Sequence, residues 1–251
     1  MSEARCDVLC VAPHTDDAEI ALGGTLALLA ARGRRIWVCD LTRGELASNA
    51  DPDERWREAE AASEVLGLAG RVQLCLPDGF VTPTDRAQLE AVVWVLRTLR
   101  PRWVLAAPEP RRHPDHLAAP ELLRRAVFLA RLVTLEPAAP RARWWPQSPP
   151  DADGPWICET LATTALPDQQ PEMMFDVTDS WSTKLVALAC FASQFQRDSD
   201  RRDTHINSPE FLTSVEARGR AWGRRAGVEY AEALVSEQAP VLDDLPGERW
   251  S

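Results

Sequence analysis

The chain has 251 residues, 45% hydrophobic and 26% charged, which excludes a disordered or fibrous protein and allows one sizeable core. Its 38 acidic and 28 basic side chains give a formal charge of −10, the opposite of what nucleic acid or anionic membranes attract. No apolar run reaches the roughly 18 residues of a membrane span, no signal peptide is evident, and six cysteines form no Cys-x-x-Cys pair, so we expect a cytoplasmic protein with free thiols.

Short apolar runs alternate with amphipathic stretches through the first half of the chain. This alternation predicts an α/β fold, namely a Rossmann-like, mostly parallel sheet with helices on both faces. Asp51 and Thr82 are the expected caps of the second and third helices. The predicted elements are strands Asp7–Ala12, Arg35–Leu41, Val72–Leu76 and Trp103–Ala107, and helices Ala18–Ala31, Pro52–Leu66 and Pro83–Leu99.

The second half is less regular, and we expect a single domain over residues 1–251. The stretch Pro137–Gly154 is rich in Pro, Arg and Trp, which predicts a loop. Gly23-Gly24 predicts close packing of its helix. The remaining predicted elements are helices Pro120–Leu132, Trp181–Phe195 and Pro209–Arg225, the last capped by Ser208, and strands Ile157–Thr164 and Phe175–Val177.

Three of the four histidines lie in two acid-flanked clusters, each directly after a predicted strand. The first is His14-Thr15-Asp16-Asp17, and the second is His113-Pro114-Asp115-His116. Ligands of an open parallel sheet bind outside the carboxyl ends of the strands. In a doubly wound sheet the fourth strand lies beside the first, so we expect the two clusters to meet across one crevice. The fourth histidine, His205, lies in a polar loop and is expected to be solvated.

Two histidines and one acid form a common ligand set for catalytic zinc, with one position left open. The remaining Asp and His then provide a general base and a general acid. The His-x-x-Asp spacing lets one turn present both side chains to an ion, but spacing alone does not identify the ligands. There are simpler alternatives to a metal site. Asp16 and Asp17 could cap the following helix, and a lone His-x-x-His motif usually lies on the surface or at a helix cap. The coincidence of both clusters at strand ends favours the metal site.

The sequence resembles the LmbE-like (PIG-L) zinc-dependent deacetylases of N-acetylglucosamine conjugates. The two His/Asp motifs carry the resemblance to this superfamily. Further pieces resemble its bacillithiol-biosynthesis branch, which acts on N-acetylglucosaminyl-malate. These pieces are Asp40–Leu46 with Ser48-Asn49, Arg55, Leu76–Gly79, Arg112–His116, Ser193–Phe195, Ser208–Phe211 and Gly227–Glu232.

The resemblance implies one Zn²⁺ per chain, held by His14, Asp17 and His116. Asp16 would be the general base, and His113, oriented by Asp115, would stabilise the oxyanion or protonate the leaving amine. For substrate binding, the resemblance implies Arg55 for the malyl carboxylates, with Arg112 and Asn49 as further candidates. A His/His/Asp set also accepts iron, cobalt or manganese.

We therefore expect a metal-dependent amidohydrolase that acts on a small sugar conjugate, binds neither nucleic acid nor membranes, and forms a homo-oligomer as its family often does. The alternatives are an inositol, lipid or thiol conjugate as substrate, and a metal-binding scaffold without activity. A magnesium-dependent receiver domain is a further alternative. It is disfavoured because Asp78 is a loose match to the acceptor aspartate and because the only lysine, Lys184, lies in a predicted amphipathic helix.

Overall fold

The computed structural model describes residues 5–107, 113–147, 152–197 and 199–237. The first half of the chain alternates strands and helices, as predicted. Its elements are β1 (Cys6–Ala12), α1 (Asp17–Ala31), β2 (Ile36–Thr42), α2 (Pro52–Leu66), β3 (Gly70–Leu76), α3 (Arg86–Leu99), β4 (Pro101–Ala106) and α4 (Pro114–Leu129).

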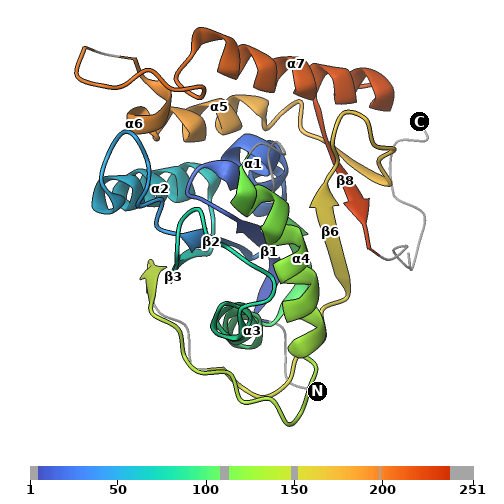
Figure 1. Cartoon of the computed structure of the whole chain (residues 1–251). Coiled ribbons are helices and arrows are strands. Elements are labelled where there is room, and N and C mark those ends of the chain that lie inside the picture. Colours follow the sequence, from blue (N-terminus) through green and yellow to red (C-terminus); the bar gives the residue numbers. More distant parts are fainter. Residues whose placement is uncertain (1–4, 108–112, 148–151, 198, 238–251) are drawn as a thin grey trace.

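The second half adds strands at both edges of the sheet and a layer of helices. Its elements are β5 (Ala142–Trp145), β6 (Thr160–Thr164), β7 (Met173–Asp176), α5 (Trp181–Ala189), α6 (Ala192–Phe195), α7 (Pro209–Ala226) and β8 (Ala231–Ser236). The eight strands form one sheet in the order β5-β3-β2-β1-β4-β6-β8-β7 (Figure 1). The strands from β3 to β6 in this order are parallel, whereas β5 and β8 run antiparallel to their neighbours. The predicted α/β fold is confirmed, with a mixed sheet.

Helices cover both faces of the sheet. Leu96 of α3 and Leu122 of α4 belong to one hydrophobic cluster, whereas Leu22 of α1 and Ala62 of α2 belong to another. The second face is also covered by α5, and α7 lies outside α5 and contacts β8 (Figure 1). Burial of both faces explains why the central strands read as continuous apolar runs.

The first strand lies between β2 and β4 in the sheet. Val11 of β1 is paired with Cys39 on one side and with Ala106 on the other. The chain therefore leaves β1 and β4 at the same edge, which confirms the expected meeting of the two histidine clusters.

Two helices begin where the sequence analysis did not predict. The predicted start of α4 at Pro120 is wrong. The helix begins at Pro114, because the side chain of His113 caps it by accepting the N–H of Asp115. Pro120 lies inside the helix, where it removes one backbone hydrogen bond. Similarly, α3 begins at Arg86 and not at Pro83, because its cap is the side chain of Asp85 and not Thr82.

The sequence analysis missed two strands, β5 at one edge of the sheet and β8 next to the other edge, whereas the edge strand β7 overlaps the predicted strand Phe175–Val177. The stretch Pro137–Gly154 contains β5, whose Trp144 ring lies 5.9 Å from the rings of Trp37 and Trp94. Residues 148–151 of that stretch lie outside the described residues. No strand was predicted for β8, which lies between β6 and β7. The predicted helix Trp181–Phe195 is divided into α5 and α6.

A buried arginine joins three elements on one side of the sheet. The Arg71 side chain is fully buried, and its Nε and Nη2 donate to the Asp40 carboxylate at 2.7 and 2.8 Å. Its Nη1 donates to Oε1 of Glu19 at 2.6 Å. This network ties β3 to β2 and to α1, the helix that follows the first histidine cluster.

A second buried ion pair fixes the middle of α1. Lys184 Nζ donates to Oε1 of Glu232 at 2.6 Å and to the Ile20 carbonyl at 2.9 Å. Glu232 also accepts the backbone N–H groups of Gly24 and Thr25. A Cβ on Gly24 would lie 2.8 Å from Val177, so the predicted close packing at this glycine is confirmed.

Among the described residues, no helix combines the length and apolarity needed to cross a bilayer.

Replacing Arg71 is expected to destabilise the fold strongly. The variant Arg71→Leu leaves the carboxylates of Asp40 and Glu19 buried without their counter-charge, which costs about 3–5 kcal/mol of unfolding free energy. Urea denaturation measures this loss. The control is Arg102→Ala, which removes a half-exposed pair with Glu159 and is expected to cost less than about 1 kcal/mol. Equal losses in the two variants would contradict the importance of the buried network.

Candidate metal centre

The two histidine clusters line one cavity of about 390 Å³ at the carboxyl ends of the central strands. Loops after β1, β2 and β3, together with the start of α4, form its floor, and the segment before and into α7 forms a wall. The lining residues are His14, Asp16, Asp17, Ile20, Leu46, Ala47, Ser48, Asn49, Arg55, Asp78, His113, His116, Gln194, Thr204, His205, Ile206 and Phe211.

Three donor atoms in this cavity form a nearly equilateral triangle. His14 Nδ1 lies 3.1 Å from Asp17 Oδ2 and 3.2 Å from His116 Nε2. His116 Nε2 lies 3.1 Å from Asp17 Oδ2. Zinc bonds of about 2.0–2.1 Å place the donors of a tetrahedral site about 3.3–3.4 Å apart. The three donors therefore fit the coordination sphere of a single ion.

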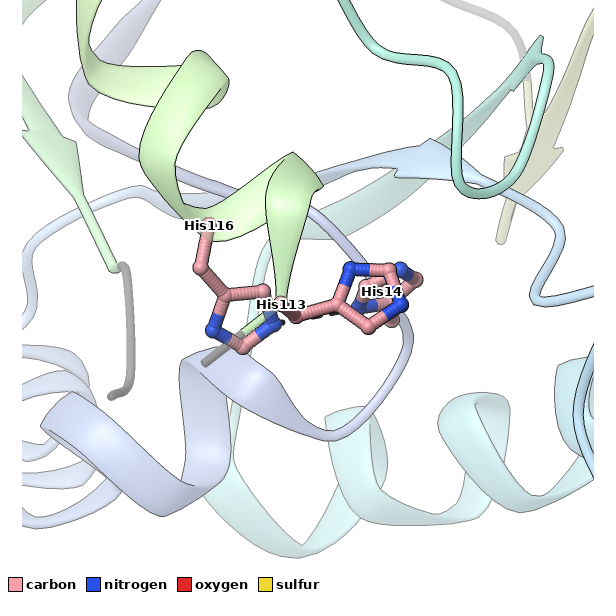
Figure 2. A group of neighbouring side chains, drawn as sticks. All are labelled: His14, His113 and His116. Carbon is pink, nitrogen blue, oxygen red and sulfur yellow. Dashed lines mark hydrogen bonds between the residues drawn. The ribbon is translucent and has the colours of Figure 1, made fainter. Parts of the chain in front are cut away.

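The imidazole of His113 lies beside those of His14 and His116 (Figure 2). The His113 and His14 rings meet edge to face, with centroids 4.6 Å apart. Donor atoms of His14, His113 and His116 all lie within 4.8 Å of one another, as do those of His14, Asp78, His113 and Asp115. The whole cluster therefore provides both imidazole nitrogens and carboxylate oxygens as ligands for a metal ion.

The two ring nitrogens of His14 have different partners. Nδ1 faces the triangle, whereas Nε2 lies 3.1 Å from Asp78 Oδ1 and 3.3 Å from Asp115 Oδ2. Burial lowers the pKa of His14, but hydrogen bonds to Asp115, Asp17 and Asp78 outweigh it and raise that pKa well above its usual value. An ion that takes the place of the Nδ1 proton would leave the remaining proton on Nε2, directed at Asp78 and Asp115.

Asp78 is a site residue that the sequence analysis missed. It follows β3, its Oδ2 accepts the N–H of Leu46 at 2.9 Å, and its own N–H donates to Glu45 at 3.0 Å. Burial raises the pKa of Asp78, but the hydrogen bonds from His14 and Leu46 outweigh it and lower that pKa. The available signal was an acid directly after a strand, the same signal that marked the other clusters.

The carboxylate of Asp115 does not hold His113 as expected. It lies 4.0 Å from His113 Nδ1, too far for a hydrogen bond, and instead accepts the N–H groups of Gly79 and Val81 at 2.8 and 3.0 Å. Asp115 does orient His113 through its backbone, whose N–H donates to His113 Nδ1 at 3.3 Å. Burial and the nearby His14 lower the pKa of His113. Because Nδ1 accepts the Asp115 N–H, the neutral ring carries its proton on Nε2.

The neighbouring residues Asp16 and Asp17 have opposite electrostatic environments. Burial raises the pKa of Asp16 to about 7, although the Arg55 guanidinium opposes this effect. Burial also raises the pKa of Asp17, but His116 and His14 outweigh it and hold that pKa well below its usual value. Two carboxylates separated in this way suit two different tasks, a proton acceptor and a metal ligand.

Asp16 has an unusual backbone. Its φ of 116° and ψ of −28° lie outside the regions open to most side chains, a strain of about 1–3 kcal/mol. Although it precedes α1, its side chain makes no capping hydrogen bond. The helix-cap alternative for Asp16 is therefore wrong, and its carboxylate faces the cavity.

The predicted substrate-side residues have partners within the protein. Arg55 Nη2 donates to the Thr15 carbonyl at 2.6 Å and to Asp16 Oδ2 at 3.3 Å. The Asn49 side chain donates to the carbonyl of Arg202 and accepts its N–H, at 3.0 and 2.9 Å, so it fastens the loop that forms the cavity wall. Arg112 lies outside the described residues.

His205 is exposed, as expected, but it also lines the cavity. Its ring meets the ring of Phe211 edge to face, with centroids 5.6 Å apart. The sequence analysis assigned no site role to this wall, because its loop follows no strand and carries no acid-flanked histidine pair.

The chain resembles known proteins in both sequence and structure. Residues 9–127, which include both clusters, match the family model described as "PIG-L: GlcNAc-PI de-N-acetylase". The solved structure of the conserved protein TT1542 from Thermus thermophilus is 34% identical, covers 97% of this chain and 99% of its own, and superimposes with a TM-score of 0.79.

Two curated relatives match most of the chain. Diacetylchitobiose deacetylase from Thermococcus kodakarensis is 30% identical over 90% of this chain and 81% of its own length. A protein from Pseudomonas putida named 4-oxalmesaconate hydratase is 26% identical over 98% of this chain and 94% of its own length.

Removing the Asp78 carboxylate is expected to weaken metal binding. Asp78→Asn keeps the shape of the side chain but loses the charge that orients His14, which costs about 10–100-fold in metal affinity. Competition with a chromophoric zinc chelator measures the affinity. The control is Asp85→Asn, which changes an acid of the same loop outside the cavity. If Asp78→Asn and the control bind zinc equally well, Asp78 has no part in the metal centre.

Proposed function

Since this chain belongs to the GlcNAc-PI de-N-acetylase (PIG-L) family, we propose that it is a metal-dependent hydrolase that removes the acetyl group from an N-acetylglucosamine conjugate. Membership of this family confirms the prediction of an enzyme that hydrolyses amides. The observation that carries the finer proposal is the triangle of donor atoms from His14, Asp17 and His116, whose sides of 3.1–3.2 Å suit one zinc ion.

We assign His14, Asp17 and His116 as the ligands of one Zn²⁺ per chain. A divalent ion held by two neutral imidazoles and one carboxylate would keep a net positive charge, and it would supply Lewis-acid chemistry at the acetamide carbonyl. Asp78 and Asp115 support this ligand set because their carboxylates accept a hydrogen bond from the Nε2–H group of His14. The same donor atoms also suit iron, cobalt or manganese. The choice of zinc among these metals is therefore part of the proposal.

Asp16 is the general base in this proposal. Its buried carboxylate lines the cavity, and its raised pKa makes it a stronger base than an exposed aspartate. It accepts a proton from water as the water oxygen bonds to the acetyl carbon. It then gives this proton to the nitrogen as the carbon–nitrogen bond breaks, so the products are acetic acid and a free amine. The acid's proton passes to the amine, and acetate and an ammonium ion leave.

His113 stabilises the carbonyl oxygen in this proposal. Its Nδ1 accepts the backbone N–H of Asp115, which leaves the Nε2 proton to donate to the oxygen as negative charge develops there. A neutral ring with a lowered pKa suits this task better than the donation of a full proton to the amine. Asp115 is assigned an orienting role through its backbone.

Within this class we propose N-acetylglucosaminyl-malate as the substrate, as in bacillithiol biosynthesis. The supporting observations are the branch motifs in the sequence and Arg55, which lines the cavity. A guanidinium at the cavity wall suits a carboxylate of the malyl group. Arg112 stays a proposed substrate contact, and Asn49 is proposed to act through the loop that it fastens.

A second candidate is the hydration of a carbon–carbon double bond in an unsaturated acid. It is favoured by the likeness to the Pseudomonas putida hydratase, which extends over 98% of this chain. The same ion and Asp16 would activate water for this reaction, which has no leaving nitrogen. The deacetylase is preferred because the family model and the relative with the higher identity both carry that activity in their descriptions.

Replacing the general base is expected to abolish most turnover without loss of the ion. Asp16→Asn should lower kcat for acetate release by about 10²–10⁴-fold, because proton transfer contributes that much. The measurements are acetate release and metal content per chain. The control is Asp7→Asn at the opposite end of β1. Full turnover in Asp16→Asn would refute the assigned role.

The identity of the conjugate is tested by comparing substrates. The metal-loaded enzyme is expected to release acetate from the malyl conjugate with a kcat/KM at least about tenfold above the inositol conjugate and diacetylchitobiose, since one charged hydrogen bond contributes about 1.5–3 kcal/mol. A preference for another conjugate overturns only the malyl assignment. Absence of acetate release from all three, with zinc bound, would leave the hydratase or a non-catalytic scaffold, and hydration of an unsaturated dicarboxylic acid separates these two.

A further inference from the structure

A glycine in the loop after β2 touches the guanidinium that holds the general base. Gly44 is buried and has a φ of +64°. A Cβ built on it would lie 2.1 Å from Arg55 Nη1 and 2.9 Å from Arg55 Cζ. No side chain can approach that closely, so the backbone at Gly44 packs directly against the guanidinium.

The opposite side of the same guanidinium faces the turn after β1. Its Nη2 donates to the Thr15 carbonyl at 2.6 Å and to Asp16 Oδ2 at 3.3 Å. Arg55 is almost fully buried, and it projects from the second turn of α2. The guanidinium therefore lies between the loop after β2 and the strained residue Asp16.

The two loops are also tied to each other directly. The Thr42 N–H and hydroxyl both donate to the Pro13 carbonyl, at 3.0 and 3.1 Å. The same hydroxyl accepts the N–H of Gly44 at 3.2 Å. Gly44 is thus held at a fixed position relative to the turn that carries Asp16, and the guanidinium has no room to withdraw toward β2.

We propose that Gly44 and Arg55 form a positioning unit for Asp16. Gly44 lets the guanidinium reach the Thr15 carbonyl and the Asp16 carboxylate, and this contact holds Asp16 in the backbone conformation that directs its carboxylate into the cavity. The role of Asp16 as base rests on the proposed function. Arg55 and Gly44 are positioning residues in this scheme and not catalytic residues.

The decisive variant is Gly44→Ala. Its methyl group displaces the guanidinium, and a displacement of about 1 Å at a reacting group costs roughly 10²-fold in rate. We expect kcat for acetate release to fall by about this factor, with KM changed less than about threefold and one zinc ion still bound per chain. The matched control is Gly33→Ala, which has a φ of +77° and nothing within 4 Å of its Cβ. It imposes similar backbone strain without a collision, so kcat should not change.

A double-mutant cycle shows whether Gly44 acts through Arg55. We expect Arg55→Ala to lower kcat and Gly44→Ala to add less than about twofold in that background. The proposal would be overturned if the double variant lost the product of the two single losses in kcat, or if Gly44→Ala left kcat unchanged. Arg55→Lys is expected to recover part of the rate, because an ammonium group can still bond the Thr15 carbonyl or Asp16.

A second readout does not depend on the substrate. Urea denaturation of the wild type, Gly44→Ala, Arg55→Ala and the double variant gives four midpoints. We expect the two shifts in midpoint to be non-additive, since the collision at residue 44 exists only when Arg55 is present. If the wild-type chain releases no acetate from any conjugate, the proposed function fails. The unfolding cycle then decides alone whether Gly44 and Arg55 act as one unit, and additive midpoints would overturn that contact.

Discussion

The candidate centre depends on the pairing of β1 with β4. Parallel strands that are adjacent in the sheet end at the same edge, and this pairing brings the turn after β1 to the first turn of α4. His14 and His116 are 102 residues apart in the chain, yet their ring nitrogens lie 3.2 Å apart. Only a topological switch between the first and fourth strands gives this contact without a long loop.

The charge of the cavity explains why a cation belongs there. Asp16, Asp17 and Asp78 line it, and Asp115 lies directly below, all of them buried. Among the described lining residues, the positive partners are Arg55 and the histidines. Several carboxylates removed from water in one place need a compensating cation. A divalent ion held by His14, Asp17 and His116 would supply part of that charge within the same cavity.

The central fold and the core of the site were predictable for physical reasons. Strands buried on both faces leave continuous apolar runs, and residue pairs such as His14 and Asp17 lie close enough in sequence for one turn to bring them together. Asp78 was not predictable in this way, because it is a lone acid whose partner is 64 residues away. The bond from the backbone of Asp115 to His113 involves no side-chain pattern, so the sequence favoured the carboxylate instead. The strands β5 and β8 were missed because each depends on pairing with a distant strand at or near an edge of the sheet.

The buried ion pair between Lys184 of α5 and Glu232 of β8 has a practical consequence for handling this protein. Lys184 is the only lysine in the chain, and only 1% of it is exposed, with its amine bonded to Glu232 and to the Ile20 carbonyl. The described surface of the folded chain therefore presents no side-chain amine to succinimidyl dyes, glutaraldehyde or amine-coupled sensor chips. Modification of Lys184 by such reagents would therefore report on molecules in which α5 has separated from α1 and β8.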